Sequence, residues 1–295
     1  MNKNGILCVH TKKHTAINRK KTFIKEKIKM KKVLSIVLSI AMLICALALV
    51  SCGSKQEELI VYTEAGFAPW EFTEKGKTDV IGVDMEIAKY IADKYNYKLK
   101  VVNGSFDAIV AGISEDNALG IAGISWRADR AEAVEFSKFY WGDAFQAVVY
   151  LKSSNPTLVD GAFAVSNFEG KGVTYQTGTT SQLTVSENKD AWKISDTKDF
   201  AEVLSALEAV KGHDDKYLIV DSQVAAQLVA SNPDFAYAAI EGVEAEQYGV
   251  VAKKGNTALI EKVNAALDEL LKKDSSGKSQ LEKWFDQYSA IEPEE

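Results

Sequence analysis

The sequence predicts an α/β fold, in which largely parallel strands alternate with helices that cover both faces of the sheets. Three observations support this prediction. Short apolar runs rich in β-branched residues alternate along the chain with apolar stripes at helical spacing. Polar or glycine-rich loops follow several of the apolar runs. Residues 52–295 are also long enough to form one large domain or two smaller lobes.

The expected elements follow each other in regular alternation. Asp84 precedes the first apolar stripe, so it is the expected N-cap of the first helix. A linker signal at 153–156 interrupts the alternation near the middle of the chain. The expected strands cover residues 59–63, 99–102, 119–124, 147–151, 173–175, 217–220, 235–240 and 248–252. The expected helices cover residues 84–95, 106–113, 200–210, 223–231 and 260–271, and the segment 281–285 closes the chain.

The N-terminal segment, residues 1–51, is typical of a secretory signal. Lys31-Lys32 precedes the uncharged stretch 33–50, and a small residue and a cysteine follow in Ser51-Cys52. This ending resembles the lipobox of bacterial lipoproteins, in which the cysteine is lipidated and becomes the new N-terminus. The resemblance implies that the rest of the chain works outside the cytoplasm, tied to a membrane by lipid on the cysteine.

A transmembrane anchor is the alternative, because the apolar stretch is nearly long enough to cross a bilayer. The small residue directly before Cys52 favours cleavage instead. Met30 with the two lysines after it would make an ordinary signal start, so an over-long gene start at residues 1–29 is one interpretation of the basic stretch before it. Residues 53–58 form a short polar tether after the lipidation site.

Processing would leave a strongly acidic chain. The whole sequence carries 35 Lys and Arg against 41 Asp and Glu. Residues 1–51 hold 11 of the basic residues and only one acid, Glu26, so residues 52–295 hold 24 basic and 40 acidic residues, a net charge of −16. Such a chain is a poor candidate for nucleic-acid binding, in which contacts to phosphates dominate. Solubility is the simpler interpretation of the acidity.

Cysteine and histidine chemistry is nearly excluded. Of Cys8, Cys45 and Cys52, only the last survives processing, so no intramolecular disulfide is expected. His213 is the one histidine after the signal, and no metal site or cofactor is expected. A Ser-His-Asp triad would have to use His213, which has no catalytic motif around it and is better interpreted as a loop residue.

Three loops follow apolar strands, at the carboxyl ends where open α/β sheets bind ligands: 64–70, 125–130 and 176–182. In the third loop, Gly178 permits a tight turn, and the amides and hydroxyls of Thr179, Thr180 and Ser181 are expected to point donors at one spot. An ordinary helix cap is the alternative interpretation of these hydroxyl residues.

The second loop and one strand end supply charges. Arg130 would bind a carboxylate through two parallel hydrogen bonds, with Ser125 and Gly123 beside it. A solvated helix start, with Arg127 as the second cation, is the alternative. Asp221 ends a strand and would receive an ammonium group, although it would also serve as a helix N-cap. Phe67, Trp70 and Phe106 are the expected apolar walls, and the whole set suits a free α-amino acid.

The ordered series of motifs resembles the amino-acid-binding family of ABC-transporter solute-binding proteins, often called family 3, from about Leu59 to Tyr288. No single motif is specific, but the series is. The matching pieces are Phe67-Ala-Pro-Trp-Glu-Phe72, Ile81-Gly-Val-Asp-Met-Glu-Ile-Ala88, Ser105-Phe-Asp-Ala108, Ala122-Gly-Ile-Ser-Trp-Arg-Ala-Asp-Arg130, Val134-Glu-Phe-Ser137, Gln176-Thr-Gly-Thr-Thr180, Asp221 and Tyr248-Gly-Val-Val251.

The resemblance implies a two-lobed, type II periplasmic-binding-protein-like fold. Residues 59–143 and 247–290 would form lobe 1, and residues 144–246 would form lobe 2, with hinge crossings near 141–146 and 243–248. The expected function is to capture a free amino acid between the lobes and deliver it to an ABC permease. The protein is expected to act as a monomer that does not bind nucleic acid.

The resemblance also implies roles for single residues. Arg130 matches the clamp for the ligand carboxylate, with Gly123 and Ser125 at the same end and Thr180 as a donor from the second lobe. Asp221 matches the acid that holds the ammonium group. The aromatic positions Phe67 and Phe106 flank the ligand side chain, and Glu64 is an acid that reaches it.

This chain departs from the family pattern at Trp126 and at Arg127-Ala-Asp129, where the family usually has Thr-Pro followed by Glu or Lys. Arg127 would favour an acidic ligand side chain and Glu64 a basic one, so the sequence chooses neither. Other functions stay open on the same scaffold. They are a dehydratase of small carboxylic acids with Glu64 or Asp221 as general acid, a sensing module for a membrane receptor, and a lipoprotein with a degenerate cleft.

Overall fold

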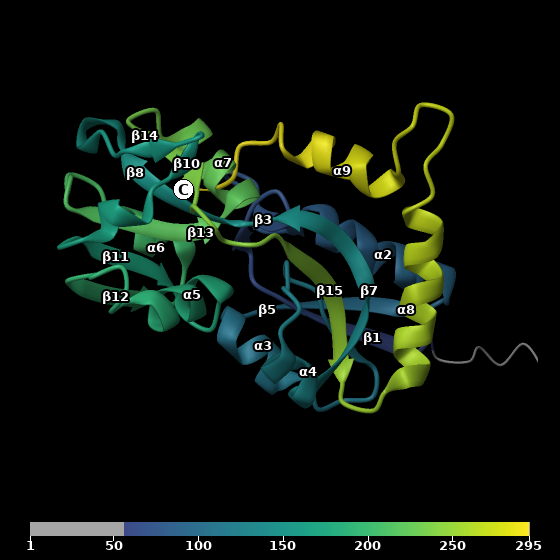
Figure 1. Ribbon diagram of the computed structural model, residues 1–295. Helices are drawn as coiled ribbons and strands as arrows, with labels where there is room; N and C mark the ends of the chain where they lie inside the picture. Colours follow the sequence, from purple (N-terminus) through teal and green to yellow (C-terminus); the bar gives the residue numbers. More distant parts are fainter. Residues whose placement is uncertain (1–55, 295) are drawn as a thin grey trace, which may run out of the picture. The chain divides into compact units, whose positions relative to one another are not determined.

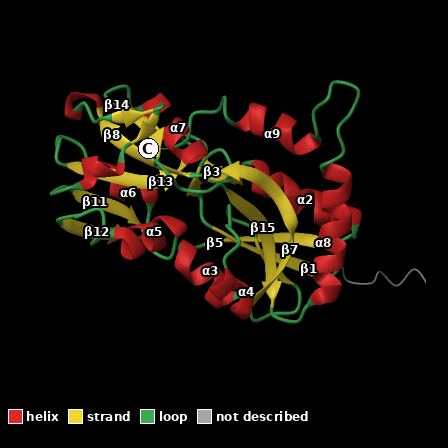
Figure 2. Cartoon of the chain, viewed as in Figure 1, coloured by secondary structure: helices red, strands yellow, loops and turns green. Residues whose placement is uncertain are grey.

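The computed structural model describes residues 56–294, which form two α/β lobes, each built around a five-stranded sheet (Figure 1). Helices flank both sheets (Figure 2). The predicted two-lobed α/β fold is confirmed. Among the described residues, no helix combines the length and apolar character needed to cross a membrane. The predicted signal, lipidation site and first tether residues, 1–55, lie outside the described part of the chain.

Lobe 1 has the strand order β5-β1-β6-β15-β7 in its main sheet and a second, three-stranded sheet of order β2-β3-β4. Its strands are β1 (Glu58–Thr63), β2 (Gly66–Phe67), β3 (Glu71–Thr73), β4 (Val80–Ile81), β5 (Lys98–Asn103), β6 (Ala118–Gly120), β7 (Val134–Ala144) and β15 (Glu246–Lys253). Its helices are α2 (Val83–Lys94), α3 (Phe106–Gly112), α4 (Ala128–Ala133), α8 (Thr257–Leu270) and α9 (Gln280–Tyr288). Helix α2 contacts both α8 and α9, and α8 packs on β7.

Lobe 2 has the strand order β12-β11-β13-β8-β14 and a small hairpin of β9 and β10. Its strands are β8 (Gln146–Leu151), β9 (Leu158–Val159), β10 (Ala162–Phe163), β11 (Gly172–Gln176), β12 (Asp196–Phe200), β13 (Lys216–Asp221) and β14 (Phe235–Ala239). Its α-helices are α5 (Thr180–Asn188), α6 (Val203–Glu208) and α7 (Ser222–Ser231), and the 3₁₀ turns are η1 (Lys152–Ser154) and η2 (Val165–Phe168).

The sheets are mixed rather than largely parallel, which corrects the prediction. In lobe 1, β1 pairs in parallel with β5 and β6, whereas β15 pairs antiparallel with β6 and β7. In lobe 2, β11 pairs in parallel with β12 and β13, whereas β8 pairs antiparallel with β13 and β14. The reversed strands β8 and β15 are those that enter each sheet directly from the other lobe, without a crossover helix.

The chain leaves lobe 1 between β7 and β8 and returns through residues 241–245 before β15. Glu246 of β15 pairs with Ala144 of β7, so the two crossing segments run side by side. The fold therefore has the two predicted hinge crossings. The residues at which the lobes divide, 143–144 and 246–247, stay a prediction.

Two expected elements need correction, and one strand was missed. The strand expected at 119–124 ends at Gly120, because the backbone turns at Gly123, whose φ is 51°. The helix expected from 200 begins only at Val203, because Phe200 pairs with Gln176 in the ladder of β12 and β11. Strand β7 was not predicted, because it lacks a simple alternation of buried and exposed positions.

The predicted N-cap of the first helix is also wrong. Gly82 occupies that position with a φ of 128°, and a Cβ there would lie only 2.1 Å from the Trp70 carbonyl oxygen. The close approach of the two chain segments therefore requires glycine at the helix entry. Asp84 is the second residue of α2, and its carboxylate points into the lobe, where it accepts hydrogen bonds from Gly123 N–H (2.8 Å) and Tyr140 O–H (2.9 Å).

Candidate functional site

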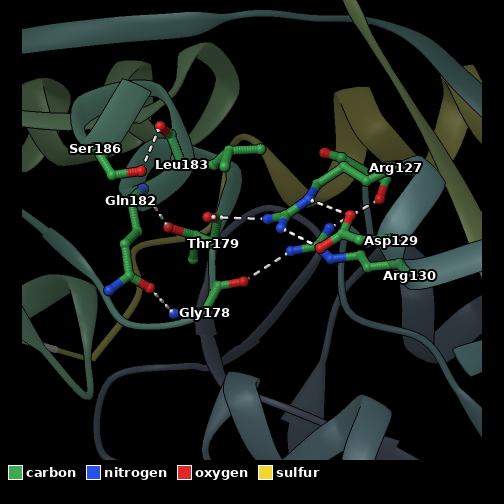
Figure 3. Close-up of polar contacts among 9 residues, drawn as sticks. Arg127, Asp129, Arg130, Gly178, Thr179, Gln182, Leu183 and Ser186 are labelled. Atoms are coloured by element: carbon green, nitrogen blue, oxygen red, sulfur yellow. Dashed lines mark hydrogen bonds and ion pairs between the residues drawn. The ribbon is translucent and has the colours of Figure 1, made fainter. Parts of the chain in front are cut away.

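Two of the predicted loops meet where the lobes face each other (Figure 3). From lobe 1, Arg130 Nη2 donates a hydrogen bond to the Gly178 carbonyl oxygen of lobe 2 at 2.9 Å. Arg127 Nη1 donates to the neighbouring Thr179 carbonyl oxygen at 3.3 Å. The lobes are therefore closed on each other in this structure, and arginines of lobe 1 bridge to the start of α5.

Arg130 is a buried cation. Its side chain also donates from Nη1 to the Ser125 carbonyl oxygen at 2.8 Å, and its guanidinium lies 5.3 Å from the ring centroid of Phe106. Burial, and secondarily the nearby charge of Arg127, lowers the Arg130 pKa to about 10, so the group is still charged at neutral pH. A guanidinium that bonds only to carbonyl oxygens in a buried place has a strong electrostatic preference for an anionic partner.

Arg127 already has such a partner. Its Nε and Nη2 donate to the two carboxylate oxygens of Asp129 at 3.0 and 2.6 Å, and this pairing lowers the Asp129 pKa. Its guanidinium is thus committed to an ion pair on α4. This removes the argument that Arg127 would select an acidic ligand side chain.

The donors at the start of α5 do not converge as predicted. Thr179 caps the helix, since its hydroxyl oxygen accepts from Gln182 N–H at 3.3 Å and its O–H donates to the Gln176 carbonyl oxygen at 2.7 Å. Ser181 turns inward and donates to Gln146 Oε1 at 2.6 Å. Of these three hydroxyls, only that of Thr180 is buried with no hydrogen-bond partner among the described residues. The Thr179 hydroxyl is used in the helix cap, and the Ser181 hydroxyl is used in a buried hydrogen bond to Gln146.

Gly178 shows why this loop needs glycine. Its φ is 78°, and a Cβ at this position would lie 2.8 Å from the Cβ of Asp107 at the start of α3. A side chain would therefore push lobe 1 and lobe 2 apart at this point. The closed contact between the lobes depends on the absence of a side chain here.

Asp221 ends β13 and is only 5% exposed. It stands at the N-cap position of α7, but its side chain makes no capping bond. Instead, its carboxylate accepts from Gln146 Nε2 at 2.7 Å and from the Tyr248 hydroxyl. Burial and the nearby Glu246 charge raise the Asp221 pKa to about 7, although these two hydrogen bonds and the positive charge of Arg130 oppose the rise. Arg130 and Asp221 thus lie near enough to influence each other's ionisation.

Phe67 and Gly123 pack tightly on each other. A Cβ at Gly123 would lie 2.7 Å from the Phe67 ring, so this position also requires glycine. Ser125 is 3% exposed and forms a bridge with Tyr248 of β15. These three predicted residues therefore line the same part of lobe 1 as Arg130.

Trp70 lies elsewhere, which corrects its predicted role as an apolar wall. Its ring is fully buried and packs against Trp141, Tyr248 and Phe285 at centroid distances of 4.9, 5.2 and 5.4 Å. The residue belongs to the aromatic core of lobe 1 and supports Tyr248, the hydrogen-bond donor to Asp221. Residue type and loop position alone could not distinguish a wall of the ligand site from a member of the aromatic core.

Glu64 follows β1 directly and is 5% exposed. Its Oε2 is buried and has no partner among the described residues. Burial, followed by the charge of Glu202, raises the Glu64 pKa to about 7, and hydrogen bonding to the Gln176 side chain opposes the rise. Glu64 is therefore a buried acid with one oxygen available to a donor.

Glu64 also borders a cavity of about 400 Å³ between the lobes, a volume within the range of small-molecule sites. Of the predicted site residues, Glu64 lines this cavity, whereas Arg130, Thr180 and Asp221 do not. No lysine or arginine lines the cavity. Its lining residues are Glu64, Ala65, Gly66, Thr73, Asn103, Gly104, Ser105, Ala201, Glu202, Val203, Leu204 and Glu294.

Sequence reasoning missed the roles of four polar residues next to the site: Glu71, Asp84 and Gln146, which are buried, and Glu246, which is partly buried. Asp84 holds the Gly123 amide, and Glu71 lies beside Asp84 with its pKa raised far above normal by burial and by the Asp84 charge. Alternating polarity along a strand does not reveal such residues. Among the described residues, no cluster of His, Cys, Asp and Glu side chains forms a candidate metal site.

Comparison with known proteins identifies the class. The family model for bacterial extracellular solute-binding proteins, family 3, matches residues 59–287. The chain belongs to this family. The family comprises solute-binding proteins, and the two-lobed periplasmic-binding-protein fold of its solved relatives is the fold of this chain.

Several relatives are similar over most of their length. The arginine-binding extracellular protein ArtP of Bacillus subtilis is 27% identical over 81% of this chain and 92% of its own. The amino acid substrate-binding protein AbpA of Streptococcus pneumoniae, solved with L-arginine, is 27% identical with a TM-score of 0.70, covering 81% of this chain and 97% of its own. An ancestral arginine-binding protein solved with arginine is 31% identical with a TM-score of 0.68, covering 79% of this chain and 100% of its own.

Proposed function

We propose that this protein captures a free α-amino acid with a cationic side chain, arginine foremost, between its two lobes. The observation that carries the proposal is Glu64, a buried acid with an unpartnered oxygen, at the edge of a cavity lined by three glutamates and no basic residue. A guanidinium or ammonium group placed there would pair with Glu64 and offset the cost of its burial.

The chain is the substrate-binding component of an amino-acid ABC importer. The choice of a cationic ligand goes beyond this function and rests on two features. Glu64 is free to bind a donor, whereas Arg127 is paired with Asp129. The names of several relatives agree, since proteins of Bacillus subtilis, Chlamydia trachomatis and Escherichia coli are described as arginine-binding. Others are described as binding cystine or glutamine, so the family alone does not decide the ligand.

We assign the α-carboxylate and α-ammonium groups of the ligand to Arg130 and Asp221. Arg130 would exchange its bond to the Gly178 carbonyl for the ligand carboxylate, and Thr180 would donate to the same group from lobe 2. Asp221 would receive the ammonium group. Because Arg130 belongs to lobe 1 and Asp221 to lobe 2, a ligand that touches both favours the closed state through contacts that an open state lacks.

A calorimetric panel of L-arginine, L-lysine, L-histidine, L-glutamine and L-glutamate tests this proposal. Arginine is expected to bind with a Kd of about 1 μM or lower, which corresponds to about 8 kcal/mol. Glutamate is expected to bind most weakly. Replacing Glu64 by glutamine removes the charge that pairs with the ligand, so arginine should bind at least about tenfold more weakly while glutamine changes little.

Glu202→Gln is the matched control, because Glu202 lines the same cavity but is exposed. Its effect on arginine affinity is expected to be less than about threefold. Glutamate binding as tightly as arginine, or an unchanged arginine affinity in Glu64→Gln, would reject the cationic assignment.

The affinity for arginine should depend on pH. Glu64 and Asp221 both have a pKa of about 7 in the structure, and both should be ionised when a cation pairs with them. Binding then releases protons below pH 7, so affinity falls as the pH falls. Each group is expected to weaken binding by about tenfold between pH 8 and pH 6. Calorimetry at pH 6, 7 and 8 measures this, and an affinity that is constant or rises on acidification would contradict it.

We further propose that Cys52 is lipidated and tethers the protein to the outer face of a membrane, next to its permease, and that the protein acts as a non-catalytic monomer. One chain supplies both lobes and all the proposed ligand contacts, which supports a monomer. Expression of the full chain in a lipoprotein-processing bacterium with labelled palmitate tests the anchor. The wild type should incorporate the label and Cys52→Ser should not, whereas equal labelling would reject this site.

A further inference from the structure

One glutamine connects the two crossing segments with the acid of the site. Gln146 is the first residue of β8, directly after the first crossing, and its side chain is fully buried. Its Nε2 donates to Asp221 Oδ1 and to Glu246 Oε1, both at 2.7 Å. Glu246 is the first residue of β15, after the second crossing. The amide therefore stands between two carboxylates that belong to different strands.

The orientation of this amide is determined by its neighbours. Its Oε1 accepts a hydrogen bond from the Ser181 hydroxyl at 2.6 Å. The opposite orientation would place the amide oxygen against two carboxylate oxygens, which is repulsive. Both N–H groups and the carbonyl oxygen of the Gln146 side chain are thus used, and the side chain has a single favourable arrangement.

The two carboxylates would repel each other without this amide. The negative charge of Glu246 is among the causes that raise the Asp221 pKa, and Glu246 Oε2 is buried without a partner among the described residues. A low-dielectric site with two adjacent acids retains a proton unless donors stabilise both. The other charged or titratable groups near the pair are Tyr248, which donates to Asp221, Arg130, and Glu71, whose pKa is raised in part by the Asp221 charge.

We propose that Gln146 is a positioning residue that keeps the Asp221 carboxylate oriented to receive the α-ammonium group of the ligand. It does this by donating to Asp221 and to Glu246 at the same time, so the arrangement of the two crossing segments determines where Asp221 points. This inference rests on the proposed function, in which Asp221 binds the ammonium group.

A comparison of two ligands tests the inference. L-arginine carries the ammonium group, and argininic acid has a hydroxyl in its place. Calorimetry with wild type and Gln146→Met at pH 8 gives the preference of each protein for arginine. The wild type is expected to prefer arginine by about 100-fold, because argininic acid leaves a buried acid without its cation. In Gln146→Met the preference should fall at least about tenfold, with argininic acid bound within about threefold of wild type.

Gln146→Leu also removes both donors, without adding a charge, and should lose the preference as well, so it carries the test if Gln146→Met does not fold. Gln227→Met is the control, because Gln227 is a partly buried glutamine of lobe 2 that donates to the Ser289 carbonyl oxygen. Its preference should equal that of the wild type.

Asp221→Asn separates failure of the inference from failure of the proposed function. If Asp221→Asn loses the preference while the Gln146 variants keep it, or weaken both ligands equally, the positioning role is overturned and the ammonium site stands. If Asp221→Asn keeps the wild-type preference, the ammonium assignment fails and the inference falls with it. Loss of the preference in Asp221→Asn and in a Gln146 variant supports both.

Discussion

Replacement of Arg130 by alanine is expected to weaken L-arginine binding by roughly 150- to 4,000-fold. Arg130 is 7% exposed and remains charged at neutral pH, so it would be the principal partner of a buried ligand carboxylate. Removing one member of a buried ion pair typically costs about 3–5 kcal/mol, because the other charge is left without a partner. Isothermal titration calorimetry measures the effect directly.

Arg127→Ala is the matched control for this prediction. Arg127 lies three residues before Arg130 and also bonds to a carbonyl oxygen of lobe 2, but its charge is paired with Asp129. Its replacement is expected to change arginine affinity by less than about fivefold. If Arg130→Ala bound arginine as tightly as the wild type, or if the two variants lost affinity equally, the carboxylate assignment would be wrong.

The second large effect is expected for Asp221→Asn. In the proposed site, Asp221 is the charged partner of the ligand ammonium group, and this replacement removes its charge. Arginine affinity should fall by about 100-fold or more, for the same reason as in the first prediction. Asparagine keeps the shape of the side chain and an oxygen that accepts from Gln146 or Tyr248, so the loss should not come from misfolding.

Stability should move in the opposite direction to affinity. Burial raises the Asp221 pKa from 3.8 to about 7, so the folded chain binds this proton more tightly than the unfolded chain does. The contribution of Asp221 to the free energy of unfolding therefore decreases as the pH rises from about 4 to about 7. Above that range, ionised Asp221 destabilises the folded protein. At pH 8, without ligand, Asp221→Asn should melt at the same temperature as the wild type or higher. A clearly lower melting temperature, or unchanged affinity, would contradict this assignment.

The sequence supported the architecture because its patterns are local. Alternating β-rich runs and apolar stripes predicted an α/β fold, and α8 shows the stripe of buried residues that its spacing indicates. The division into two lobes was implied by the family resemblance. The direction of β8 and β15 was not predictable in the same way, because it depends on where the chain crosses between lobes. No local signal distinguishes a strand that follows a crossover helix from one that arrives directly from the other lobe.

The roles of single polar residues were also not predictable from local sequence patterns. Asp84 has the residue type and position of an N-cap, yet it is used to hold the Gly123 amide, because Gly82 provides the entry to α2. Gln146 has no chemical signature at all, and its importance arises from two acids that are 75 and 100 residues away in the sequence. The choice between Glu64 and Arg127 likewise required the structure, since only the contact with Asp129 shows that Arg127 is committed.

A crystal structure of the protein with L-arginine tests the central claim most directly. The ligand carboxylate is expected at the Arg130 guanidinium, the ammonium group at the Asp221 carboxylate and the ligand guanidinium at Glu64, each within hydrogen-bonding distance of about 3 Å. The lobes should remain closed around it. Arginine bound in the reverse direction, or at a place that touches only one lobe, would contradict the account.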